Sequence, residues 1–146
     1  MVISLYGVSK TIMQIPFGIV CDKIGDKLTL KLALLLMGLV PIGYILSNTS
    51  LQAGSLYVIQ GATLGMAAPA TYSVLARTLN VKRRGECTGL ASAVFTLGGG
   101  IGAAIASFIL TKLNNFSMAF NISSLGIFFT LIYVIIRVNK VKPNEK

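Results

Sequence analysis

Five long apolar runs, separated by short polar connections, constrain this chain more than any other feature. A helix needs about 20 apolar residues to cross the hydrocarbon core of a bilayer, and each run is of roughly that length. Lipid offers the backbone no hydrogen-bond partners, so a crossing segment must satisfy its own. We therefore predict an all-α, polytopic transmembrane helical bundle with spans at residues 2–21, 30–46, 51–76, 87–111 and 116–136, followed by a basic tail at 137–146.

The composition supports a membrane protein. Only 12% of the 146 residues are charged and the mean hydropathy is +0.79, whereas soluble domains average about 25% charged residues. The net charge of +9 lies almost entirely in the connections and the tail. This placement indicates contact with the lipid bilayer and its anionic headgroups. No basic face with interleaved aromatic residues exists, so we expect no nucleic-acid partner.

The basic residues predict the orientation of the chain. One side of the membrane receives most of them, and the opposite side holds only Lys112 in its connections. By the positive-inside rule the basic side is cytoplasmic. We predict a cell-membrane protein with its N-terminus outside and its C-terminus in the cytoplasm. The basic residues on the cytoplasmic side are Lys23, Lys27, Arg77, Lys82, Arg83, Arg84, Arg137, Lys140, Lys142 and Lys146.

The residue types for enzymatic or metal chemistry are scarce. The two cysteines, Cys21 and Cys87, fall near the predicted cytoplasmic turns, where reducing conditions disfavour a disulfide. The chain has no histidine and its cysteines lack metal-ligand spacing. No Ser/His/Asp, Cys/His or paired-carboxylate group can be assembled. We expect no enzyme activity, no metal site and no cofactor.

A short charged turn joins the first two spans and carries the most specific pattern in the chain. The pattern is Gly-x-x-x-Asp-Lys-x-Gly-x-Lys, and its fixed residues are Gly18, Asp22, Lys23, Gly25 and Lys27. A glycine at position 18 allows another helix to come close. A glycine at position 25 permits the backbone reversal of a tight loop.

This pattern, placed between two membrane spans, resembles the signature loop of the major facilitator superfamily of secondary transporters. Asp26 departs from it, because the family usually has a basic residue there. The resemblance implies that Asp22 latches the cytoplasmic side in one conformation, and a carboxylate can accept hydrogen bonds from the start of a neighbouring helix. The alternative is a solvated loop acid. The family's halves have six helices each, so the resemblance covers five helices of one half.

Further motifs bear on which half is present. Gln60-Gly61 resembles a fourth-helix motif of the family, with Tyr57 in place of its arginine. Gly98-x-x-x-Gly102 resembles part of a fifth-helix motif, with Ala103 in place of its proline. These two degraded motifs and the basic tail favour helices eight to twelve, in the C-terminal half. The run from Gln14 to Gly18 looks more like a second helix, so the other half stays open.

Lys10 is the most informative single residue for function. It precedes Asp22 by twelve residues, which places it roughly 18 Å from the cytoplasmic boundary, near mid-bilayer. A charge there is costly unless it faces a cavity or a partner. We predict that Lys10 lines a central cavity and binds an anionic group or takes part in proton coupling. The alternatives are that it snorkels outward, or that the helix starts late. Gln14 lies one turn away on the same face and is the second candidate.

Two pairs of glycines, Gly61 with Gly65 and Gly98 with Gly102, are predicted to pack helices closely. The resemblance as a whole implies a fragment of a secondary active transporter that moves a small solute by alternating access. We expect it not to be competent alone, and to need the missing half or another copy as a partner. The alternatives are a non-transporting membrane scaffold or interaction protein, and a truncated reading frame.

Overall fold

The computed structural model describes residues 2–78 and 84–138, which form five α-helices. They are α1 (Val2–Ile24), α2 (Asp26–Leu46), α3 (Ser50–Thr78), α4 (Arg84–Leu113) and α5 (Phe116–Val138). The structure confirms the predicted all-α bundle. The predicted polar loop at 77–86 is shorter than expected, since α3 extends to Thr78 and α4 already begins at Arg84. The part of the basic tail from residue 139 onward lies outside the described residues.

Three of the five helices are long and apolar enough to cross a membrane by length and composition. Within the described residues these candidate spans are Asp26–Leu46, Thr88–Lys112 and Phe116–Arg137. Helices α1 and α3 carry more polar side chains, such as Lys10 in α1 and Gln60 in α3. The two more polar helices are those that pack most extensively on each other.

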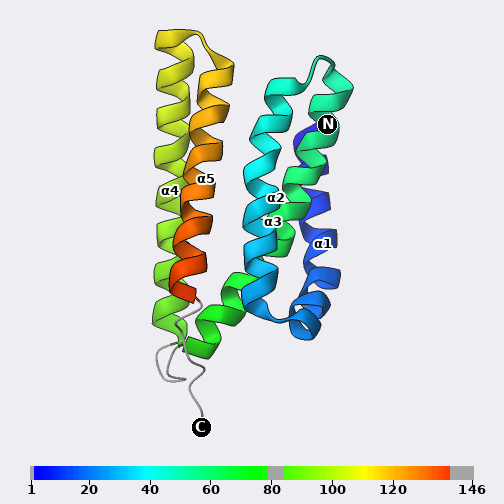
Figure 1. Ribbon diagram of the computed structural model, residues 1–146, viewed down its shortest axis with the longest axis vertical. Helices are drawn as coiled ribbons and strands as arrows, with labels where there is room; N and C mark the ends of the chain where they lie inside the picture. The colour runs from blue at the N-terminus through cyan, green and yellow to red at the C-terminus, as the bar shows by residue number, and fades with distance from the viewer. Residues whose placement is uncertain (1, 79–83, 139–146) are drawn as a thin grey trace.

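The helices alternate in direction, which gathers their connections at two ends of the bundle (Figure 1). The α1/α2 turn, the end of α3, the start of α4 and the end of α5 share one end. The α2/α3 and α4/α5 turns lie at the opposite end. Lys23 and Arg137 belong to the first end and Lys112 to the second.

The closest helix contact joins α1 and α3 through two glycines. A Cβ atom added at Gly61 would lie 2.6 Å from the carbonyl oxygen of Tyr6, and one added at Gly65 would lie 2.6 Å from that of Lys10. The Ser9 hydroxyl donates a 2.8 Å hydrogen bond across the same interface to a backbone carbonyl of α3. Small residues and interhelical hydrogen bonds hold helices together in membranes, where lipid is as apolar as leucine.

Helix α2 occupies the centre and contacts both α3 and α5. The Tyr44 hydroxyl donates to the Gln60 side-chain oxygen of α3 at 3.2 Å. On the other side, the Ser124 hydroxyl of α5 donates to the carbonyl of Gly38 at 2.8 Å. A Cβ at Gly38 would lie 3.2 Å from the Phe128 ring. Thus α5 is held against α2 by the same combination of glycine and hydroxyl that joins α1 and α3.

Helix α4 is the least enclosed of the five. Among its side chains that the structure describes, Ile109 is the one that is buried, whereas Val94, Leu97 and Ile101 are largely exposed. A Cβ added at Gly98 or at Gly102 would meet no atom within 4 Å. The close packing predicted at this second glycine pair is therefore absent within the described part of the chain.

Replacing Gly65 by alanine should destabilise the bundle, because the new methyl group meets backbone and the helices must separate. Overpacking of this kind costs about 1–3 kcal/mol. Gly54→Ala is the matched control, because it lies in the same helix with open space around its Cβ position. Thermal unfolding in detergent micelles, followed by circular dichroism, should show a lower midpoint for Gly65→Ala only. Equal midpoints for the two variants would contradict the close contact.

Candidate functional site

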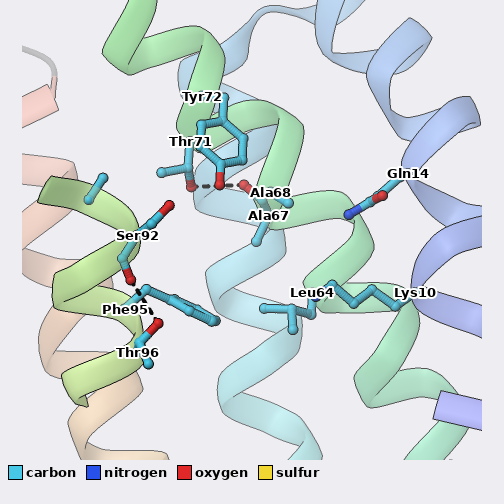
Figure 2. Close-up of a pocket in the computed structure, with 11 residues that line it drawn as sticks. Lys10, Gln14, Leu64, Ala67, Ala68, Thr71, Tyr72, Ser92, Phe95 and Thr96 are labelled. Carbon is cyan, nitrogen blue, oxygen red and sulfur yellow. Dashed lines mark hydrogen bonds between the residues drawn. The ribbon is translucent and has the colours of Figure 1, made fainter. Parts of the chain in front are cut away.

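A cavity of about 310 Å³ lies between α1, α3 and α4. Figure 2 shows α1 side chains entering from one side and α4 side chains facing them from the other, with α3 forming the wall between. Helices α1 and α3 meet too closely at Gly65 to leave space between their backbones. The cavity therefore opens beside this contact, toward α4. It is lined by Lys10, Gln14, Leu64, Ala67, Ala68, Thr71, Tyr72, Ala91, Ser92, Phe95 and Thr96.

The structure brings Lys10 and Gln14 together in this cavity. They are four residues apart on α1, so one helical turn places both side chains on the face toward α3 and α4. Both side chains are half-buried. Among the described residues, Lys10 is the one positively charged residue in the lining, and no acidic residue of this part of the chain lines the cavity.

Hydroxyl groups supply most of the remaining polarity. The Thr71 hydroxyl donates to the carbonyl of Ala67 at 2.8 Å, and that of Thr96 donates to the carbonyl of Ser92 at 2.9 Å. Because each hydroxyl donates its hydrogen to a carbonyl of its own helix, it can only accept a hydrogen bond from a molecule in the cavity. Sequence reasoning did not find these α3 and α4 residues. An isolated threonine or serine in an apolar helix does not indicate a binding site unless it is known which face of the helix it occupies.

The predicted latch residues lie together at the α1/α2 turn. Gly25 adopts φ 100° and ψ 142°, a conformation open to glycine and strained for other residues. Asp22 and Lys23 are exposed, and Lys27 is half-buried. A Cβ at Gly18 would meet nothing within 4 Å. The turn thus presents Asp22 outward, with no element of the described chain packed on Gly18.

Asp26, the departure from the family pattern, is the buried acid of this turn. Its side chain is 5% exposed, in the first turn of α2. One carboxylate oxygen accepts the backbone N–H of Lys27 at 2.8 Å, and the other accepts the Ser73 hydroxyl of α3 at 3.2 Å. The positive end of the α2 dipole also favours a carboxylate here. Asp26 therefore ties the start of α2 to α3.

Removing the Asp26 carboxylate should destabilise the protein, whereas removing that of Asp22 should not. Asp26→Ala leaves the Ser73 hydroxyl and an α2 amide without this acceptor, which costs about 1–3 kcal/mol. Asp22→Ala removes an exposed carboxylate four residues away and should change stability by about 0.5 kcal/mol or less. Unfolding midpoints in micelles compare the two variants. A larger loss for Asp22→Ala would refute this assignment of the buried acid.

Comparison with models of protein families gives a match that covers the whole chain. Comparison with curated proteins finds no match to the chain. The model of the Major Facilitator Superfamily matches residues 1–146, the whole sequence. This match agrees with the signature pattern at the α1/α2 turn, with the all-helical bundle and with the cavity beside Lys10. The chain belongs to the major facilitator superfamily of membrane transporters.

Proposed function

We propose that this chain takes part in secondary active transport of a small solute across the cell membrane by alternating access. The observation that supports this most is the cavity, in which a lysine and a glutamine from α1 face hydroxyl groups of α3 and α4. Transporters bind their substrates near the bilayer midplane, between helices. A volume of about 310 Å³ is at the lower end of the range of small-molecule sites.

Alternating access requires two helical units that rock about the site. The α4 side chains of Ser92, Phe95 and Thr96, which line the cavity, are exposed in the described structure. We propose that a second unit covers this side. A complementary transporter half and another copy of this chain both fit that role.

Asp22 is proposed as the latch that closes the cytoplasmic side in one conformation. Its exposure leaves the carboxylate accessible to the exposed amides of a helix on the second unit. Asp26 is engaged with α3. The two acids of the turn would then have separate roles, with Asp26 stabilising the fold and Asp22 acting between units.

An uptake assay tests transport and the latch together. Bacterial cells expressing the chain should accumulate at least one solute of a radiolabelled panel above vector controls, and an ionophore that collapses the ion gradients should prevent it. Asp22→Asn should lower this uptake severalfold at unchanged membrane abundance, because a neutral amide holds a helix N-terminus less well. No accumulation of any solute rejects transport by copies of this chain alone and leaves the complementary half as the required second unit. Normal uptake by the variant rejects the latch only.

The proposed topology, N-terminus outside and C-terminus inside, is tested by single-cysteine labelling. In a Cys21→Ala, Cys87→Ala background, Asn48→Cys at the α2/α3 turn should react with an impermeant maleimide in intact cells. Lys23→Cys at the opposite end of the bundle should react only after permeabilisation, because the positive-inside rule places it in the cytoplasm. The reverse labelling pattern would overturn the orientation.

A further inference from the structure

We propose that the cavity between α1, α3 and α4 selects a small organic anion with an apolar body, and that the Lys10 ammonium is its counter-ion. This inference rests on the proposed transport function and names the solute class for the same site. Its basis is the unequal distribution of charge along the helices and the mixed polarity of the cavity wall.

Within residues 2–78 and 84–138, the acidic side chains lie away from the cavity. Asp22 and Asp26 are at the α1/α2 turn, and Glu86 is in the first turn of α4. None of them lines the cavity. A lone ammonium far from the membrane surface is costly unless an opposite charge or water compensates it. Since the lining provides no carboxylate, an anionic group of the solute is the compensating charge that the site lacks.

The position of Lys10 on α1 is fixed by the contact with α3. Its carbonyl oxygen lies against Gly65, so the backbone at this point cannot turn away from α3 without opening the tightest interface of the bundle. The side chain is half-buried and extends along the cavity beside Leu64 (Figure 2). This geometry favours the cavity over outward snorkelling, the alternative that the sequence left open.

Several polar groups of the cavity wall can donate hydrogen bonds to a carboxylate. The Gln14 amide reaches into the cavity from the same face of α1 and offers N–H donors (Figure 2). The hydroxyls of Tyr72 and Ser92 line the cavity and can also donate. The cavity wall therefore holds hydrogen-bond donors from three helices besides the lysine.

The rest of the wall is apolar. Alanines of α3 and α4, together with Leu64 and Phe95, make up this surface. The Phe95 ring projects from α4 into the space opposite α1 (Figure 2). An aromatic ring or short alkyl chain would bury its surface there, while its charged end meets Lys10. Inorganic anions would leave this apolar wall without a partner, so we infer an aryl or alkyl monoanion about the size of benzoate.

Binding of benzoate and its neutral isostere benzamide to the purified full chain in lipid nanodiscs tests this inference. Isothermal titration should give a dissociation constant for benzoate that is roughly tenfold or more below that for benzamide, as expected for a charge-assisted contact. Lys10→Gln should remove this difference. Lys112→Gln is the control, because it removes an exposed lysine at the end of α4.

Circular dichroism melting establishes that both variants are folded. Equal affinity for the two probes, no benzoate binding by the unaltered chain, or unchanged benzoate binding in Lys10→Gln would each overturn the anion site. Solute uptake without such selectivity would leave transport standing and this inference rejected. Lys10-dependent benzoate binding without uptake of any solute would support the anion site and reject transport by copies of this chain.

Discussion

The close approach of α1 and α3 at Gly61 and Gly65 is the contact on which the rest of the structure depends. In lipid, apolar side chains gain little by meeting one another, so helices need backbone proximity and hydrogen bonds to stay together. Two glycines and the Ser9 hydroxyl provide both at this interface. The α2/α5 interface repeats the solution with Gly38 and Ser124. The contact of α2 with α3, which includes the Tyr44–Gln60 hydrogen bond, connects these two pairs, so α1, α2, α3 and α5 form one continuous unit.

The contact between α1 and α3 also determines where the Lys10 side chain leaves α1. Because Gly65 seats against the Lys10 carbonyl, the lysine side chain must leave α1 beside the interface, where the cavity opens. A methyl group at Gly65 would therefore disturb both stability and the position of the one cation in the lining. Packing and binding are not separable at this point of the fold, so a variant here has to be assessed by both measurements.

The sequence predicted the helices well because they depend on local periodicity, and the same periodicity gives Lys10 and Gln14 a common face of α1. The long apolar runs fixed the five helices, and the four-residue spacing placed Lys10 with Gln14. It could not predict contacts between distant segments. Asp26 and Ser73 are separated by 46 intervening residues, and Asp26 looked like a mere departure from a family pattern until the structure paired them. The α3 and α4 hydroxyls in the cavity were invisible for the same reason. For Gly98 and Gly102 the packing pattern has no partner within the described chain, so close packing there stays a prediction.

The cavity combines the most firmly held and the least firmly held parts of the molecule. One wall belongs to α1 and α3, which are in backbone contact, and the other belongs to α4, whose side chains are mostly exposed. A solute that touches Lys10 and Phe95 at once bridges these two parts. Its binding free energy then depends on the separation of α4 from α1, so it must favour the separation that fits it best. A ligand can shift a conformational equilibrium only through such differential contacts. If the proposed solute binds there, the placement of one wall on the loosely packed α4 couples its binding to movement of that helix.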